Sequence, residues 1–369
     1  MSTRLLSVGT ALPAHRHDQG EITDAFARVV VARGASERLL RSVHANAGVE
    51  QRHLVLPLEK YESLADFDEA NGLFIEHAVD LGAQAMLRAL AGAGLAASDV
   101  DLIISTTVTG LAVPSLDSRI AAVVGLREDV KRVPLFGLGC VAGAAGVARL
   151  HDYLLGHPDD VAVLVAVELC SLTVQRDDTS VANIVASGLF GDGAAAVVMG
   201  GAGRAGGTRS TGGAGRVEVL DSRSRLYPDS ERTMGFDVGA SGLRIVLDAQ
   251  VPAIVARHLG GDVDRFLAGH GLTRADIGWW VCHPGGPKVI DALRDALDLA
   301  DHDVALTRTS LARIGNLSSA SVLHVLADTF AQRPPAPGTH GLLMAMGPGF
   351  CSELVLLRAT DDDDEDAAS

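Results

Sequence analysis

Three polar side chains stand where predicted elements change direction, and the first of them has the features of a nucleophile. Cys140 follows a short apolar run and precedes a segment rich in small residues that reads as a helix. The positive end of a helix dipole and its unpaired N–H groups favour the thiolate, which is the reactive form of cysteine. Gly139, Gly143 and Gly146 permit a sharp turn and leave room for a thioester. We therefore predict a nucleophilic Cys140, against the alternative that a free cysteine is simply buried and inert.

His283 and Asn316 are the predicted partners of this thiol. His283 ends an apolar run and is followed by Pro-Gly-Gly-Pro-Lys, so it is presented where the chain turns. An imidazole within reach can stabilise a thiolate and then polarise a carbonyl group, although a structural histidine is the alternative. Asn316 lies in the segment GNLSSAS, where it can cap a helix, or its NH2 group can donate to a developing enolate oxygen.

The elements around these residues alternate between helix and strand. Helical periodicity over residues 72–93 leads into a buried strand over 101–108. A second apolar strand over 133–140 leads into a buried helix over 141–156, and two further strands follow over 161–169 and 193–200. This alternation predicts an α/β fold.

The second half of the chain repeats this outline. Residues 275–284 resemble 98–107, and residues 313–328 resemble 138–153, with a glycine, a polar reactive residue, small residues and then a helix in each. Two last strands are predicted over 341–349 and 352–359. Such internal similarity indicates a duplicated architecture, in which Cys140 and Asn316 occupy equivalent helix N-termini that face one cleft.

The domain boundaries follow from composition. We predict an N-terminal half over residues 1–215 that carries the cysteine and a C-terminal half over 216–360 that carries the histidine and asparagine. Residues 199–216 are rich in glycine and predict a flexible connection. The tail 361–369 begins with six consecutive acidic residues and is predicted to be disordered.

Charge and composition exclude several classes of protein. The 369-residue chain has a formal net charge of -15, which argues against nucleic-acid binding. Its four cysteines form no CxxC pair, so neither a disulfide framework nor a zinc site is expected. We expect a cytoplasmic chain with no membrane span, because no apolar run is long enough and no signal segment is evident. The sequence has no GxxxxGK[ST] motif or strand-linked GxGxxG, and we expect no nucleotide cofactor and no metal.

Five stretches carry a specific resemblance. PLFGLGCVAGAAG, LFGDGAAA, HPGGPK, GNLSSAS and MGPGF occur in an order and at intervals that resemble type III polyketide synthases, the chalcone and stilbene synthase-like family of the thiolase-like superfamily, in its bacterial form. HPGGP with GPGF distinguishes this family from the ketoacyl synthases. The resemblance implies a thiolase-like duplicated αβαβα five-layered fold, a homodimer, and malonyl-CoA with an acyl-CoA starter as substrates.

The resemblance also implies a role for each matching residue. Cys140 would accept the acyl chain, while His283 and Asn316 would drive decarboxylation of malonyl-CoA and stabilise the enolate. Val113 would cross the dimer interface, and Arg52 and Lys288 would bind coenzyme A. The residues that would line the substrate cavity are Phe190, Cys170, Thr173, Ile245, Ser318, Gly347, Pro348, Gly349 and Phe350. We further expect Gly347 and Gly349 to adopt backbone torsions that other residues avoid.

The identity of the starter and the product depends on the residues that line the substrate cavity. Ile245 stands where plant members have a phenylalanine, which would widen the pocket and favours a fatty acyl starter with an alkylpyrone or alkylresorcinol product. The first alternative is an enzyme primed by malonyl-CoA itself, of the tetrahydroxynaphthalene or dihydroxyphenylacetyl-CoA type. The second is an enzyme like ketoacyl-ACP synthase III, to which the acidic chain and HPGGP are ill suited. A non-catalytic acyl-binding relative would be expected to lack one of the three catalytic residues.

Overall fold

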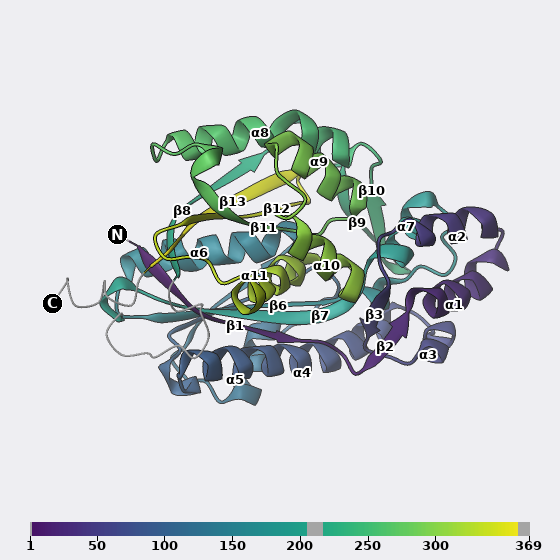
Figure 1. Cartoon of the computed structure of the whole chain (residues 1–369). Helices are drawn as coiled ribbons and strands as arrows, with labels where there is room; N and C mark the ends of the chain where they lie inside the picture. The colour runs from purple at the N-terminus through teal and green to yellow at the C-terminus, as the bar shows by residue number, and fades with distance from the viewer. Residues whose placement is uncertain (1, 205–216, 361–369) are drawn as a thin grey trace.

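The computed structural model describes residues 2–204 and 217–360, and nine strands of this part of the chain join in one sheet (Figure 1). The order across the sheet is β11-β12-β13-β8-β1-β7-β6-β4-β5. The strands are β1 (Thr3–Ala11), β4 (Leu102–Thr107), β5 (Lys131–Phe136), β6 (Val161–Leu169), β7 (Asp192–Gly200), β8 (Val217–Leu226), β11 (Ile277–Cys282), β12 (His340–Gly347) and β13 (Cys351–Ala359). Two hairpins stand apart from this sheet, β2 (His15–Asp18) with β3 (Gln51–Leu54) and β9 (Met234–Gly239) with β10 (Gly242–Leu247).

The helices lie in three layers around this sheet. The outer helices of the first half are α4 (Phe67–Ala93) and α5 (Leu116–Val124), and those of the second half are α8 (Val251–Ala268) and α9 (Pro287–Leu297). Between the halves lie α6 (Ala142–Gly156) and α11 (Ser321–Gln332), which contact strands from both (Figure 1). The remaining helices are α1 (Gln19–Val31), α2 (Glu37–Ala45), α3 (Leu58–Ser63), α7 (Val181–Leu189) and α10 (Ala305–Ile314). The first-half strands and the second-half strands of the sheet lie on opposite sides of α6 and α11, so strands and helices alternate in the predicted five layers (Figure 1).

Strand pairing shows the duplication. In the first half β1 and β6 both run antiparallel to β7, and β6 runs parallel to β4. In the second half β8 and β12 both run antiparallel to β13, and β12 runs parallel to β11. The halves differ before the reactive residue, since β5 precedes Cys140 whereas α10 precedes Asn316. A short antiparallel pairing of Thr3–Leu5 with Val217–Val219 joins the halves into one continuous sheet.

The small residues of α6 are explained by its position in the central layer. Residues 142–148 of this helix are all buried. A Cβ added at Gly143 would lie 2.3 Å from the carbonyl oxygen of Ser319, and one at Gly146 would lie 2.5 Å from Leu164. The glycines therefore let α6 approach both a strand and the N-terminal end of α11, as the predicted buried helix requires.

One predicted strand ends earlier than expected. The strand predicted over 133–140 is β5, which ends at Phe136 and is followed by a bend and a 3₁₀ turn over Gly139–Val141. Gly137 and Gly139 have φ of +94° and +55°, which strands do not tolerate. The predicted boundary at residue 215, most of the glycine-rich connection and the acidic tail 361–369 lie outside the described residues.

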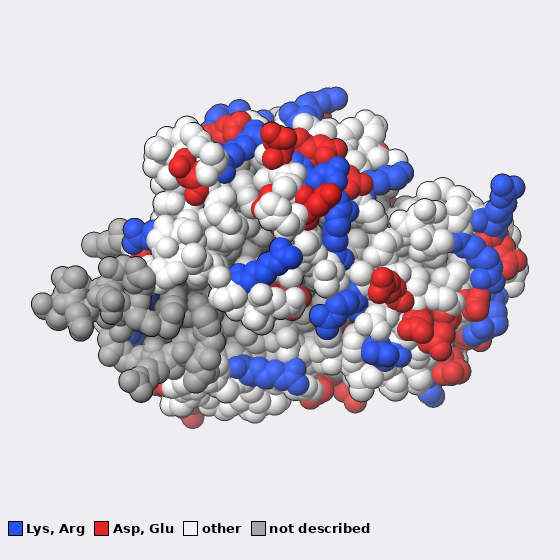
Figure 2. All heavy atoms as spheres, viewed as in Figure 1, with Lys and Arg blue, Asp and Glu red and all other residues white. Residues whose placement is uncertain are grey.

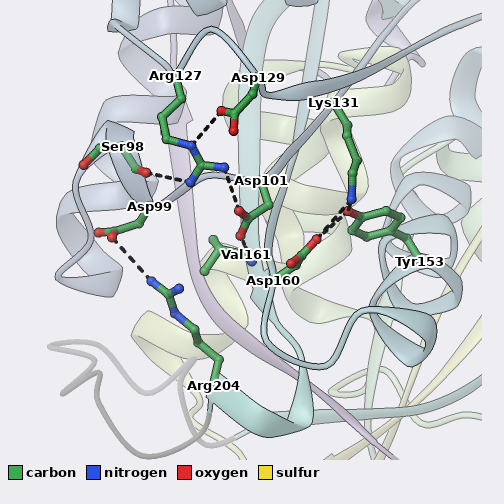
Figure 3. Close-up of polar contacts among 10 residues, drawn as sticks. All are labelled: Ser98, Asp99, Asp101, Arg127, Asp129, Lys131, Tyr153, Asp160, Val161 and Arg204. Atoms are coloured by element: carbon green, nitrogen blue, oxygen red, sulfur yellow. Dashed lines mark hydrogen bonds and ion pairs between the residues drawn. The ribbon is translucent and has the colours of Figure 1, made fainter.

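Polar clamps tie the starting ends of three first-half strands together (Figure 3). Arg127 donates to one oxygen of Asp101 at 2.8 Å, and the other oxygen accepts the backbone N–H of Val161 at 2.7 Å. Nearby, Lys131 donates to the Tyr153 hydroxyl at 2.6 Å, and that hydroxyl donates to Asp160 at 2.5 Å. These contacts fix the register of β4, β5 and β6, which lead toward the cysteine turn.

Charge on the surface is mixed in sign. Figure 2 shows acidic and basic side chains interleaved on the face drawn, and ion pairs such as Arg274 with Asp264 and Arg41 with Glu37 join them. No helix among the described residues is long and apolar enough to cross a membrane.

A matched pair of glycine substitutions in α6 tests the close approach. Gly143→Ala places a methyl group against the Ser319 carbonyl, so we expect a loss of ~1–3 kcal/mol in the free energy of unfolding. Gly156→Ala in the same helix meets nothing within 4 Å, and it should leave stability unchanged or slightly raised. Urea unfolding curves measure both, and equal stabilities would show that the approach is not tight.

Candidate active site

Cys140 lies in the 3₁₀ turn that leads into α6, at the point where the two halves meet. Its thiol donates to the Ser318 hydroxyl at 3.6 Å, and its side chain is buried. Ser318 belongs to the matching 3₁₀ turn over Ser318–Ala320, which leads into α11. The two turns are in contact, so the N-termini of α6 and α11 face each other as predicted.

The GPGF loop packs directly against the cysteine turn. A Cβ at Gly139 would lie 2.8 Å from Pro348, and one at Gly347 would lie 2.6 Å from the backbone nitrogen of Val141. Gly347 is therefore required for close approach, and the torsion expected of it is absent, since it is not among the described glycines with positive φ. Gly349 does have a positive φ of +138°. Phe350, next in the loop, is fully buried.

His283 stands where the sequence predicts, directly after β11. Its backbone N–H donates to the Met344 carbonyl at 3.0 Å, which extends the pairing with β12 by one residue. Both ring nitrogens are buried and have no hydrogen-bond partner. A buried nitrogen without a partner costs free energy, so the ring is held ready for a ligand atom.

Asn316 is anchored through its backbone and its amide oxygen. Its N–H donates to the Leu189 carbonyl at 2.9 Å, and its own carbonyl accepts from Gly191 at 3.0 Å. The Oδ1 atom accepts from the Ser318 N–H at 2.8 Å and from the Ser321 hydroxyl at 3.3 Å. The oxygen is thus engaged, and the NH2 end of the amide is the end that can donate to a further group.

Two cavities meet at Cys140. The larger, of about 120 Å³, is lined by Cys140 together with the predicted residues Phe190, Cys170, Thr173, Ile245, Ser318 and Pro348. The smaller, of about 40 Å³, is lined by Cys140, Phe190, His283, Asn316 and Phe350. The thiol therefore faces an acyl-sized space on one side and the imidazole and amide on the other.

Several residues of this site gave no signal in the sequence. Phe236 pairs directly with Ile245 across the β9–β10 hairpin, and both line the larger cavity. An aromatic side chain therefore stands beside the position where Ile245 was expected to open the pocket. Tyr61, from α3, lines the same cavity.

Glu168 is a further residue that the sequence did not single out. One of its oxygens accepts from the Ser319 hydroxyl at 2.5 Å. The other accepts from the Val108 N–H at 3.0 Å and the Thr109 hydroxyl at 2.9 Å. Burial raises the pKa of this carboxyl, and these hydrogen bonds oppose the rise. Glu168 thus fastens the turn of Ser318 to the end of β4.

The residues predicted to meet coenzyme A or a second subunit lie in different environments. Lys288 is exposed at the start of α9, and Val113 is 95% exposed. Arg52 is only 2% exposed, and it lines the larger cavity. A buried position gives no support to the prediction that Arg52 meets a coenzyme A phosphate. No group of three or more potential metal ligands occurs within 2–204 and 217–360.

Burial acts against charge on Cys140 and His283. It raises the pKa of the Cys140 thiol to about 12, with the Ser318 hydrogen bond opposing and the Glu168 charge adding to the rise. It also lowers the pKa of His283 to about 3. Each group alone is therefore neutral at pH 7. A proton passed from the thiol to the imidazole leaves the net charge unchanged. The attraction between the resulting thiolate and imidazolium offsets the free-energy cost of burying each charge.

The pH profile of alkylation tests this proton exchange. If His283 takes the proton, iodoacetamide should modify wild-type Cys140 at a rate that levels off near neutral pH. In His283→Gln the thiol keeps its raised pKa, so the rate should be at least about tenfold lower at pH 7 and rise about tenfold per pH unit. Coinciding profiles for the two proteins would exclude the exchange, and Cys140→Ala provides the background.

Comparisons with known proteins agree with this geometry. Residues 2–203 match the family model of chalcone and stilbene synthases, N-terminal domain, and residues 218–361 match that of the C-terminal domain. The chain is 55% identical over 96% of its length to a 1,3,6,8-tetrahydroxynaphthalene synthase of Streptomyces peucetius, of which it covers 93%. It is 35% identical over 96% of its length to a 3,5-dihydroxyphenylacetyl-CoA synthase of Streptomyces toyocaensis, of which it covers 90%.

A solved structure extends the similarity to three dimensions. The crystal structure of the 1,3,6,8-tetrahydroxynaphthalene synthase of Streptomyces coelicolor, a bacterial type III polyketide synthase, matches with a TM-score of 0.88 at 31% identity. The match covers 97% of this chain and 99% of that one. With both family models matched in order, and with a cysteine, a histidine and an asparagine gathered at one site, this chain belongs to the chalcone and stilbene synthase family and is a type III polyketide synthase.

Proposed function

We propose that this enzyme is primed by malonyl-CoA and makes an aromatic polyketide of the tetrahydroxynaphthalene type. The observation that carries the proposal is the 55% identity, over almost the whole chain, to a 1,3,6,8-tetrahydroxynaphthalene synthase. The fatty acyl starter expected from Ile245 has no such support. Phe236 gives a physical reason against it, since this aromatic side chain lies beside Ile245 in the strand pairing and lines the same cavity.

The first step of the proposed reaction loads the starter. The Cys140 sulfur attacks the thioester carbonyl of malonyl-CoA, the carbon–sulfur bond to coenzyme A breaks, and coenzyme A leaves as its thiol. Proton transfer from Cys140 to His283 supplies the thiolate. The acyl group then occupies the larger cavity, which Cys140 lines.

The second step extends the chain. A further malonyl-CoA binds with its thioester oxygen toward His283 and the NH2 of Asn316, which line the smaller cavity. Loss of CO2 leaves an enolate, whose negative oxygen these donors stabilise. The enolate carbon attacks the thioester on Cys140, the Cys140 sulfur leaves, and the lengthened chain returns to it by thioester exchange.

The carbon count of the product class fits a single substrate. A naphthalene ring has ten carbons, which equals five malonyl groups that each lose one carbon as CO2, four in the extension steps and one from the carboxyl group of the starter. Its hydroxyl groups on alternate carbons match the ketones that such a chain carries. A second candidate, favoured by the 35% identity to a 3,5-dihydroxyphenylacetyl-CoA synthase, would retain coenzyme A on the product. Product mass distinguishes the two.

The proposal has two further parts that concern binding partners. Lys288 is exposed at the start of α9, just after the turn of His283, and we assign it to a coenzyme A phosphate. The protein is also proposed to act as a homodimer. Val113 is 95% exposed, and its loop leaves β4 at Thr107, which pairs with the exposed Phe136 of edge strand β5. Exposed apolar side chains such as these are typical of an interface when they form one patch.

Incubation with malonyl-CoA as the only thioester tests the function. Wild type should release a tetrahydroxynaphthalene or its oxidation product, detected by liquid chromatography and mass spectrometry, and Cys140→Ala should release none. Addition of palmitoyl-CoA should yield no long-chain pyrone or resorcinol. A strict requirement for an added acyl-CoA starter would contradict the malonyl-primed reading, while leaving the polyketide synthase chemistry intact.

Substitution of Val113 tests the dimer. Val113→Asp places a charge in the proposed interface, so sedimentation velocity should show a shift from dimer toward monomer. Val238→Asp is the matched control, because Val238 is 68% exposed on the separate β9–β10 hairpin. A wild-type protein that sediments as a monomer, or equal effects of both substitutions, would argue against this interface.

A further inference from the structure

Arg52 is a buried cation in the wall of the larger cavity, and its hydrogen bonds are incomplete. Its Nε donates to Gln19 at 3.1 Å, and its Nη1 donates to the Phe190 carbonyl at 2.6 Å. Its Nη2 is buried and has no partner. Burial lowers the pKa of Arg52 to about 10, opposed by Asp192, Cys170 and Tyr61, so the guanidinium stays charged at neutral pH. Cys170 and Tyr61 line the same cavity.

Asp192 is the carboxylate whose charge favours the charged form of Arg52, but no hydrogen bond between the two side chains is found. One oxygen of Asp192 accepts from the Ser171 N–H at 2.8 Å. The other accepts from the Ser171 hydroxyl at 2.5 Å and from the Val55 N–H at 2.9 Å. Asp192 is therefore occupied by neutral donors, and the free N–H groups of Arg52 remain available.

Half of the buried polar side-chain atoms that lack a hydrogen-bond partner in the described part of the chain belong to residues that line the two cavities. Within residues 2–204 and 217–360, six buried side-chain nitrogen or oxygen atoms have no partner. Three of them belong to Arg52 and His283, which line the cavities on the two sides of Cys140. Each such atom costs free energy unless a ligand supplies the missing hydrogen bond. In the proposed reaction the extender unit binds beside His283 in the smaller cavity, whereas Arg52 belongs to the larger cavity, which would hold the chain on Cys140.

We propose that Nη2 of Arg52 donates a hydrogen bond to an oxygen of the acyl chain held on Cys140. That oxygen is either a ketone oxygen of the growing chain or a carboxylate oxygen of a malonyl starter. Arg52 thereby selects chains that carry oxygen beyond the thioester over plain alkyl chains of the same length. This role replaces the coenzyme A contact expected from the sequence, and only the malonyl source of the oxygen rests on the proposed function.

Single-turnover loading of Cys140 from three thioesters tests the selection. Intact-protein mass spectrometry would follow adduct formation from malonyl-CoA, acetoacetyl-CoA and butyryl-CoA, the last two differing by one ketone oxygen. Arg52→Lys keeps a positive charge but removes the forked donor, so loading from the oxygen-bearing thioesters should fall about tenfold or more while loading from butyryl-CoA changes less than about twofold. Gln19→Leu, which removes the Nε partner and leaves Nη2, should affect all three equally.

Each result has a distinct meaning. An equal loss for all three thioesters in Arg52→Lys, or no loss for any, would overturn the proposal and leave Arg52 as a support for the Phe190 backbone. A loss confined to malonyl-CoA identifies the carboxylate, and one confined to acetoacetyl-CoA identifies the ketone. If the wild type is not loaded by malonyl-CoA but prefers acetoacetyl-CoA to butyryl-CoA, the proposed function is contradicted. Loss of that preference in Arg52→Lys would still support the proposed hydrogen bond from Arg52.

A second measurement does not depend on an Arg52 variant that folds. A crystal structure of Cys140→Ala with acetoacetyl-CoA should place the ketone oxygen within hydrogen-bond distance of Nη2. A bound chain whose ketone oxygen lies away from Arg52 would overturn the proposal.

Discussion

The structure depends on the close approach of two backbone turns at the centre of the molecule. The turn of Cys140 and the turn of Ser318 come from opposite halves, and each leads into a helix of the central layer. Gly143 allows α6 to lie against the Ser319 backbone, while Gly139 and Gly347 allow the GPGF loop to lie against the cysteine turn. Because interiors are close-packed, these contacts fix where the thiol can be.

Buried polar contacts carry this constraint outward. Glu168 joins the Ser318 turn to the end of β4, and backbone hydrogen bonds join Asn316 to the segment of Phe190. Arg52 in turn donates a hydrogen bond to the Phe190 carbonyl. Cys140, Asn316 and the wall of the larger cavity are consequently parts of one connected framework, so a substitution at one of them is expected to alter the positions of the others.

The burial of Cys140, His283 and Asn316 governs the charge and hydrogen bonding of the site. Burial opposes charge on Cys140 and on His283, yet a proton exchanged between them creates ions that offset each other. The same burial would strengthen hydrogen bonds from Asn316 and His283 to the enolate of the proposed reaction. It also makes an unpartnered guanidinium such as that of Arg52 a strong donor to any oxygen that enters the larger cavity.

The sequence by itself determined the family, the duplicated α/β fold and the positions of Cys140, His283 and Asn316 at element ends. The family followed from the resemblance of five motifs. For the elements local chemistry was enough, because glycines, small residues and apolar runs specify turns, buried helices and strands over a few residues. Only the tertiary structure decided that Phe236 stands opposite Ile245 and that Arg52 is buried rather than exposed. Cavity shape and burial are set by side chains from segments far apart in the chain, and no local pattern records which of them meet.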